Sequence, residues 1–596
     1  MLIVEGTMKN IVAILCVLLH VSNSAMVTAL SEKPNVLFIV IDDLRASLGC
    51  YGGPIISPNI DQLASKSALF TNAMVQQSVC APSRTSFLTG RRPDTTRLYD
   101  FGSYWRRHAG NYTTLPQHFK ENGYFTASVG KVFHPGVTSG GHDDYPYSWS
   151  VPPYHPPTEQ YTGAKVCPTL DGTLHNNVMC PVNVSVMPQK SLPDIQSLEF
   201  SSSILKNLSV ALHPTNKQGK PIETGQPSQD MQPPFFLAVG FHKPHIPWKY
   251  PEEFKSLYPI ESVSIATNPY RSPTQPDVAY EDYYTMRTYR EDVKAMNMSF
   301  PFGTIPLKFH APMRQSYYAA ASYTDSLVGK LLQTLDETGF SNNTIVVLFG
   351  DHGWQLGEHA EWCKYSNYEL ATRVPLIVHI PGVTDKPRSS PIKNQLQNSL
   401  KMIKSQDNVK LSAASGMVVA EFVELVDLFP TLSDLASITV PPVCPPEPFN
   451  VTLCSEGYSF APLLEPVQGS NAILQKDGME KLTSKRYSRW KNATFSQYPR
   501  PGVIPNKKTD LPSLGDITVM GYSMRTKDHH YTEWIGFNPK TFQGNWTDVK
   551  ATELYINGLD YDQNQNVAAD PQFKDIVKQL SYQLQKGWRE SLPVPA

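Results

Sequence analysis

Five short runs that are apolar at almost every position constrain the fold of this chain most strongly. In chain order they cover residues 35–41, 125–130, 235–241, 344–349 and 376–380. Continuous apolar runs of this length are typical of strands buried on both faces, as in a parallel sheet. Helical patterns lie between them, at 60–64 after Ser57-Pro58, at 115–122 before Gly123, and at 313–338 before Gly339. Strands that alternate with helices predict an α/β fold with a large, mostly parallel sheet between layers of helices.

The runs place this large domain at residues 35–456. Residues 457–485 lose periodicity and gain Pro, Gln, Ser and Lys, which predicts an exposed linker that is open to proteolytic processing. Strand patterns at 516–525 and 531–537, followed by a helical pattern from about 571 to 590, predict a smaller α+β subdomain with an antiparallel sheet at 486–596. The polar, aperiodic stretch 213–233 predicts a surface loop.

The first 24 residues have the pattern of a secretory signal peptide. Lys9 precedes an apolar run at 11–21, and small residues follow at Ser22 and Ser24. The run is about half of the roughly 20 residues that a membrane span needs, so we expect no membrane anchor. Either Met1 or Met8 can start such a signal, and residues 25–34 would be a short propeptide or a flexible N-terminus.

Secretion allows disulfides to form. Of eight cysteines, Cys16 leaves with the signal, so seven remain and at least one is unpaired. Two pairs each flank a Pro-rich loop of about a dozen residues, a loop size that a local disulfide can close. We therefore predict the disulfides Cys167–Cys180 and Cys444–Cys454. The roles of Cys50 and Cys363 stay open.

Eight Asn-x-Ser/Thr sequons fit a luminal or extracellular glycoprotein. They lie at Asn111, Asn183, Asn207, Asn297, Asn342, Asn450, Asn492 and Asn545. The net charge is −1, from 52 Lys and Arg against 53 Asp and Glu, which gives no long-range attraction to nucleic acid. We expect no nucleic-acid partner, and any anionic substrate must be bound by local positive charge.

Acidic residues follow two of the predicted strands. Asp42 and Asp43 come after the first run, and Asp351 and His352 after the fourth. Ligands of open α/β sheets collect at the carboxyl ends of strands, and carboxylates that converge there repel one another unless a cation lies between them. Oxygen-rich ligands favour calcium first and magnesium second, rather than zinc. The alternative is that Asp42 and Asp43 only cap a following helix.

A second motif centres on Cys80. The sequence is Cys-Ala-Pro-Ser-Arg at 80–84, with Thr-Gly-Arg at 89–91. Pro82 and Ser83 predict the start of a helix, so Cys80 would face the positive end of a helix dipole; the alternative is a buried or disulfide-bonded cysteine. The motif resembles the signature of the sulfatase family. In that family a formylglycine-generating enzyme oxidises the cysteine to formylglycine.

The resemblance extends along the chain. Asp42-Asp43, Gly-Lys-Val-Phe-His at 130–134, Gly-Phe-His-Lys-Pro-His at 240–245, Gly-Asp-His-Gly at 350–353 and Lys364 follow the order of the family. It implies an alkaline-phosphatase-like fold whose large domain is catalytic. It also implies catalytic roles for Cys80, Arg84, Lys131, His134 and His245, substrate binding by Lys364 and Tyr365, and one calcium ion held by Asp42, Asp43, Asp351, His352 and position 80.

Each implied role has a plainer alternative. Lys131 and Lys364 would by default be solvated, and His245 would more often be a packing residue. Many sulfatases place the histidine two residues after the lysine, whereas here His134 follows Lys131 by three. If His245 is the general acid, an unperturbed imidazole predicts that it is protonated near pH 5.

The segments 92–100, 131–135 and 496–501 resemble the branch of the family that acts on sulfated iduronate. This implies a monomeric lysosomal enzyme, delivered by the secretory pathway, that hydrolyses the 2-O-sulfate of terminal L-iduronate in heparan and dermatan sulfate. Lys364 with Tyr365 or His359 would bind the sugar carboxylate. Trp105 and Trp354 would either stack on sugars or pack in the core.

Three alternatives are left open. The chain could be a sulfatase with another sugar specificity, or a phosphatase or phosphodiesterase of the same fold. Those phosphate-ester enzymes use a serine or threonine nucleophile and usually two zinc ions, whereas position 80 is cysteine. It could also be an inactive glycan-binding glycoprotein, although all the implied metal, nucleophile and cation positions are intact.

Overall fold

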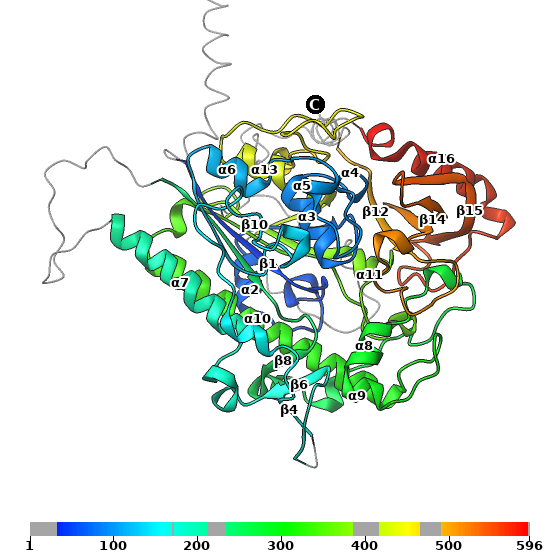
Figure 1. The fold of residues 1–596 in the computed structure, drawn as a ribbon, viewed down its shortest axis with the longest axis horizontal. Helices are drawn as coiled ribbons and strands as arrows, with labels where there is room; N and C mark the ends of the chain where they lie inside the picture. The colour runs from blue at the N-terminus through cyan, green and yellow to red at the C-terminus, as the bar shows by residue number, and fades with distance from the viewer. Residues whose placement is uncertain (1–32, 170–171, 213–232, 386–415, 465–489, 594–596) are drawn as a thin grey trace, which may run out of the picture.

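A large mixed sheet forms the centre of the computed structural model, which describes residues 33–169, 172–212, 233–385, 416–464 and 490–593 (Figure 1). Within these ranges its seven strands lie in the order β11-β2-β10-β9-β1-β7-β3. They are β1 (Asn35–Ile41), β2 (Ala68–Met74), β3 (Phe125–Gly130), β7 (Phe235–Phe241), β9 (Thr344–Gly350), β10 (Arg373–His379) and β11 (Met417–Glu424). All five apolar runs are strands of this sheet, so the predicted α/β class is confirmed.

The sheet is mostly parallel, with one exception. β9, β1, β7 and β3 are parallel neighbours, whereas β10 runs antiparallel to both β9 and β2. The prediction of a parallel strand at the fifth run is therefore wrong. After β9 the chain does not cross back through a helix to the other end of the sheet. It re-enters at the end where β9 finishes, so β10 must run antiparallel to β9. Buried strands of either direction are equally apolar, so the sequence did not reveal it.

Helices cover both faces of the sheet (Figure 1). Leu37, Ile39 and Ile41 of β1 belong to one hydrophobic cluster, and Val36, Phe38 and Val40 belong to another on the opposite face. The first cluster includes side chains of α2 (Pro58–Ala64), α7 (Pro193–Leu212) and α10 (His310–Glu337), and the second those of α3 (Cys80–Thr89), α6 (Leu115–Glu121) and α13 (Leu428–Leu435). The three helical patterns in the sequence are α2, α6 and α10.

Shorter elements complete the large domain. They are α4 (Pro93–Thr96), α5 (Trp105–His108), α8 (Tyr284–Tyr289), α9 (Glu291–Lys294), α11 (Glu369–Thr372), β4 (Cys167–Pro168), β5 (Leu174–His175), β6 (Met179–Val182) and β8 (Trp248–Pro251).

A separate antiparallel sheet lies towards the C-terminus. Its strands pair in the order β12 (Ala493–Arg500), β13 (Val519–Thr526), β14 (His529–Asn538) and β15 (Gln543–Ile556). The helix α16 (Lys574–Ser591) packs on it. The two predicted strands are β13 and β14. The prediction missed β12, which contains Pro499, and β15, whose polar and half-exposed residues lack the apolar signal of a core strand.

Part of the predicted linker is buried. Tyr458 and Phe460 pack in a hydrophobic cluster with Leu463 and Leu464 of α14 (Ala461–Leu464). The prediction of an exposed segment from 457 onward is therefore corrected for 457–464. The rest of that linker, the predicted signal peptide and nearly all of the predicted 213–233 loop lie outside the described residues.

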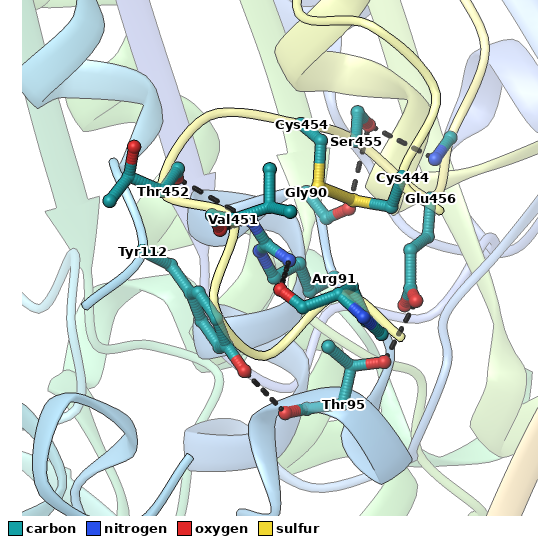
Figure 2. Close-up of a disulfide and its surroundings, with 12 residues drawn as sticks. Gly90, Arg91, Thr95, Tyr112, Cys444, Val451, Thr452, Cys454, Ser455 and Glu456 are labelled. Atoms are coloured by element: carbon teal, nitrogen blue, oxygen red, sulfur yellow. Dashed lines mark hydrogen bonds between the residues drawn. A yellow bond between two sulfur atoms is a disulfide. The ribbon is translucent and has the colours of Figure 1, made fainter. Parts of the chain in front are cut away.

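Both predicted disulfides are present, Cys167–Cys180 and Cys444–Cys454. Figure 2 shows that the loop closed by Cys444 and Cys454 surrounds Arg91, which follows α3. The buried Arg91 guanidinium donates to the carbonyl of Val451 at 2.6 Å and lies 3.8 Å from the centre of the Tyr112 ring. The disulfide loop therefore holds the C-terminal end of the helix that begins at Cys80.

The asparagines of all eight sequons are exposed, although glycosylation itself stays a prediction. Among the described residues no helix is long and apolar enough to cross a membrane. Cys50, Cys80 and Cys363 are free.

Glu369 forms a buried ion pair that connects the large sheet to the C-terminal sheet. The Glu369 carboxylate lies 2.6 Å from Arg525 Nε of β13 and 3.1 Å from Arg373 Nε. Burial opposes ionisation of Glu369, but Arg525 and Arg373 outweigh it and lower its pKa to about 2. The stabilisation is therefore complete above the unfolded pKa of about 4.5 and is lost as the pH falls from there to about 2.

Glu369→Gln should lower the free energy of unfolding by about 3–5 kcal/mol at pH 5, because it leaves buried guanidinium groups unpaired. Urea unfolding midpoints measure this, and the difference from wild type should shrink at pH 3. Asp516→Asn is the control, since it removes the exposed Lys508–Asp516 pair and should change stability little. A deficit of equal size at pH 3 and pH 5 would contradict the assignment.

Candidate active site

The four residues predicted to hold a metal lie side by side, just beyond the carboxyl ends of two neighbouring central strands. Asp42 and Asp43 follow β1, and Asp351 and His352 follow β9. β1 and β9 are parallel neighbours, with Ile41 paired with Gly350, so both strands deliver their next residues to the same place. All four side chains are fully buried.

Cys80 lies at the centre of this group. It is the first residue of α3, and its Sγ is 3.4 Å from Asp42 Oδ1, 3.3 Å from His352 Nε2 and 3.2 Å from Lys364 Nζ. The predicted disulfide alternative for this cysteine is thereby excluded, because Cys80 is free. The sequence placed Cys80 just before a helix, and the structure places it in the first turn.

Each carboxylate has a cation of its own. Lys131 Nζ lies 2.5 Å from Asp42 Oδ2, Lys364 Nζ lies 2.6 Å from Asp43 Oδ1, and Arg84 Nε lies 2.9 Å from Asp351 Oδ2. Both lysines are buried. The alternative that Lys131 and Lys364 are ordinary solvated lysines is therefore wrong.

Arg84 connects several parts of the site through ion pairs and hydrogen bonds. It is fully buried, and besides Asp351 it donates to the backbone carbonyls of Lys131 and Val132. Its second terminal nitrogen is 3.3 Å from Asp42. The arrangement fixes two carboxylates and the end of β3 relative to α3.

Hydrogen bonds fix the orientation of the three histidines. The Nδ1 atoms of His352, His245 and His134 lie 2.9, 2.6 and 2.9 Å from the carbonyls of Gly353, Ile246 and Pro135. A carbonyl can only accept, so Nδ1 carries the proton and, in the neutral ring, Nε2 keeps its lone pair. One ligand atom each of Asp42, Asp43, Cys80 and His245 lie within 4.8 Å of one another, so His245 reaches the centre of the site.

The expected protonation of His245 is corrected. Burial, with Lys131 and Lys364 nearby, lowers the pKa of His245 well below 6.5. The free site therefore holds a neutral His245 near pH 5, and burial and Lys131 act in the same way on His134. The unperturbed value used for the prediction assumed solvent exposure.

The carboxylates fit a bound cation. Burial raises the pKa of Asp43 to about 6 and that of Asp351 to about 7, although Lys364 and Arg84 act in the opposite direction. Asp43 Oδ2 is buried and has no hydrogen-bond partner. Asp42, Cys80, Asp351 and His352 also form a group whose ligand atoms lie within 4.8 Å of one another. This donor set of hard oxygens with one imidazole is able to hold a divalent ion.

The Cys80 thiol is not activated in this environment. Burial and Asp42 raise its pKa to about 12, despite the opposing effect of Lys131 and Lys364. An unmodified thiol here stays protonated and is a weak nucleophile.

A cavity of about 160 Å³ opens beside the site. Lys131, His134 and His245 belong to its lining. Its remaining wall combines apolar and charged side chains, among them Met187, Leu192, Ile246, Glu159, Lys243 and Lys249. A substrate in this cavity would meet the site from the side of the two histidines.

Three residues proposed for sugar binding are packing residues. His359 is buried, stacks on Tyr368 with ring centres 4.2 Å apart, and has its Nε2 2.8 Å from the carbonyl of Asp562. Trp105 and Trp354 are completely buried, against Phe133 and Trp248. The prediction that His359 contacts substrate is therefore corrected, and the packing alternative holds for both tryptophans. Tyr365 is buried beside Lys364, with its carbonyl bound by Arg500 at 2.8 Å.

Sequence reasoning missed Tyr317, which positions Asp43. Its hydroxyl donates to the Asp43 carbonyl at 2.6 Å, while the Asp43 N–H donates to Asp351 at 3.0 Å. Asp43 has a φ of 61°, and these bonds hold it in that left-handed conformation. Tyr317 lies within the long helix α10, where a tyrosine carries no sequence signal for such a role.

Comparisons with known proteins agree with this geometry. The model of the family "Sulfatase" matches residues 34–438. Iduronate 2-sulfatase of Mus musculus is 47% identical over 559 residues, 94% of this chain and 95% of that protein, and iduronate 2-sulfatase of Homo sapiens is 47% identical over 557 residues, 92% and 94% of the two chains.

Solved structures share the fold. A 2-O GAG sulfatase superposes with a TM-score of 0.57 at 20% identity, covering 94% of this chain and 93% of that one. A phosphonate monoester hydrolase of Agrobacterium radiobacter gives 0.59 at 17% identity, covering 94% and 96%. From the family match over residues 34–438 and the identity with two sulfatases over nearly the whole length, we conclude that the chain belongs to the sulfatase family of sulfuric ester hydrolases.

Proposed function

We propose that this protein hydrolyses the 2-O-sulfate ester of terminal L-iduronate in heparan and dermatan sulfate, and that it works in the lysosome. The observation that carries the proposal is the enclosure of Cys80 by Asp42, His352 and Lys364, in a chain 47% identical to two iduronate 2-sulfatases. The signal peptide pattern and the exposed sequons support delivery through the secretory pathway.

Position 80 is proposed to act as formylglycine. A protonated thiol of pKa about 12 is a poor nucleophile, whereas an aldehyde at this position hydrates to a diol with two hydroxyl groups on one carbon. One hydroxyl attacks sulfur and the ester oxygen leaves with its bonding electrons. The second hydroxyl then loses its proton, the carbon–oxygen bond to the sulfate breaks, and the aldehyde is restored.

The surrounding side chains would carry the protons and the charge. His134 Nε2, with its free lone pair, accepts a proton from the diol, and His245 passes a proton to the leaving sugar oxygen once it has taken one up. Lys131 and Lys364 are the fixed positive charges closest to position 80, and they would stabilise the sulfate oxygens. Arg84 acts as a positioning residue, because its guanidinium already pairs with Asp351 and Asp42 and donates to two backbone carbonyls.

Calcium is the proposed metal, held by Asp42, Asp43, Asp351 and His352 with position 80. When bound, the ion would neutralise the converging carboxylates and polarise a sulfate oxygen. Lys131, Lys364 and Arg84, which each pair with one of the carboxylates, would balance the remaining negative charge around the ion.

Sulfate release from a disaccharide with terminal 2-O-sulfated iduronate tests the proposed function. Two comparison substrates are the same disaccharide carrying sulfate only on the hexosamine, and a phosphate monoester of similar size. We expect hydrolysis of the first alone, and a mass for the peptide around position 80 that corresponds to conversion of the thiol into an aldehyde. Equal rates on the hexosamine sulfate, or an intact thiol in fully active protein, would contradict the proposal.

The metal identity is a separate prediction. Elemental analysis of purified protein should find calcium, and Asp351→Asn should lose bound calcium together with activity, because the remaining ligands no longer outweigh the cost of removing the ion from water. Asp336→Asn, a surface carboxylate bonded to Ser341, should retain both. A stoichiometric zinc content without an alkaline earth ion would overturn this prediction.

A further inference from the structure

Three buried carboxylates form a second acidic group outside the active site. They belong to Glu281 and Asp282, which precede α8, and to Asp510, which lies between β12 and β13. One oxygen from each lies within 4.8 Å of the others. Glu281 and Asp282 are completely buried, and Asp510 is 2% exposed.

The backbone satisfies one oxygen of each carboxylate and leaves the other without a partner. The N–H groups of residues 283, 284 and 285 donate in turn to Glu281 Oε1 at 2.5 Å, Asp282 Oδ1 at 2.9 Å and Asp510 Oδ2 at 2.8 Å. Glu281 Oε2, Asp282 Oδ2 and Asp510 Oδ1 are buried and have no hydrogen-bond partner. Each of three neighbouring carboxylates therefore keeps one buried oxygen without a hydrogen bond, and a buried polar atom that lacks a partner is costly.

The three carboxylates lack a directly paired side-chain cation in the described part of the chain, and Arg287 acts on Asp282 without forming an ion pair. Arg287 donates to the carbonyls of Ser299 and Gly303. Arg500 donates to the carbonyls of Val278 and Tyr365. Both guanidinium groups thus donate to backbone oxygens, and neither forms an ion pair with the three carboxylates.

We infer that Glu281, Asp282 and Asp510 bind a second divalent cation, calcium by preference, which joins the large domain to the C-terminal sheet. One oxygen of each carboxylate lies within 4.8 Å of the others, close enough for all three to reach one ion, and calcium accepts carboxylate oxygens in a flexible, irregular geometry whereas magnesium demands a near-ideal octahedron. An all-oxygen ligand set also disfavours zinc. The ion would connect segments that are far apart in the chain, and so would act on the association of the two sheets.

Counting bound calcium at pH 7 tests this inference. After dialysis against calcium, wild type should retain two ions per chain. Asp282→Asn and Asp351→Asn should each retain one, from different sites, and the double variant none. Asn at 282 still accepts the Tyr284 N–H, so the backbone contact survives. The control Asp336→Asn should retain two.

Thermal unfolding gives a second readout that does not depend on activity. Added calcium should raise the unfolding temperature of Asp351→Asn, in which only the proposed site remains, and should leave the double variant unchanged. If Asp282→Asn fails to fold, Glu281→Gln provides the same comparison, since its amide still accepts the Tyr283 N–H. One calcium per wild-type chain would overturn the inference, because the carboxylates would then share protons instead. A count of two that Asp282→Asn and Glu281→Gln both leave intact would overturn it as well.

Discussion

Replacing Cys80 by serine is expected to give a folded protein that transfers at most one sulfate and then stops. A serine hydroxyl fits where Sγ lies between Asp42, His352 and Lys364, and it could accept a sulfate. It has no second hydroxyl on the same carbon, so the sulfate ester cannot collapse to an aldehyde. We expect steady-state turnover to fall on the order of 10³-fold or more, in line with removal of a catalytic nucleophile.

Single-turnover kinetics with mass analysis of the peptide around position 80 would measure this. The serine variant should accumulate up to one covalent sulfate per chain. Cys50→Ser is the matched control, because Cys50 is also a free cysteine but lies outside the active site, and it should turn over normally. Multiple turnover by Cys80→Ser at the wild-type rate would show that position 80 does not need two hydroxyl groups.

Local patterns in the sequence were enough to predict that Asp42, Asp43, Asp351 and His352 lie together. A buried strand followed by Asp42-Asp43 and another followed by Asp351-His352 need only one further condition, that the strands run parallel and are neighbours, and β1 and β9 are. The two disulfides were predictable for a similar reason, since each closes a short loop whose ends are close in the chain.

Long-range contacts account for what the sequence did not show. Lys131 and Lys364 are far from Asp42 and Asp43 in the chain, and only the folded structure shows that each lysine pairs with one of them. His359 has the residue type for a carboxylate ligand, yet it is used for stacking on Tyr368. Tyr317 shows the converse, a residue of α10 whose bond to Asp43 is visible only after folding.

The position of Lys364 changes what its replacement should do. If Lys364 bound the sugar carboxylate, its replacement would lower kcat/KM far more for a sulfated uronate than for a small aryl sulfate. The structure instead places Lys364 Nζ 2.6 Å from Asp43 Oδ1 and 3.2 Å from the sulfur of Cys80. It also does not line the cavity beside the site, which Lys131 and Lys249 do. Lys364 is therefore close to position 80, where the sulfate ester of every substrate would react.

We expect Lys364→Ala to lower kcat/KM by about 10²–10³ for both a sulfated iduronate disaccharide and an aryl sulfate, because it removes a preorganised charge at the reacting atoms. The ratio of the two efficiencies should stay within a few-fold of wild type. Lys249→Ala is the comparison variant. Its ammonium donates to the carbonyl of Tyr161 at 2.9 Å, and the residue lines the cavity beside the site, so its loss should affect the disaccharide and spare the aryl sulfate. If Lys364→Ala lowers kcat/KM ten-fold more for the disaccharide than for the aryl sulfate, Lys364, with Tyr365 beside it, would instead bind the sugar carboxylate.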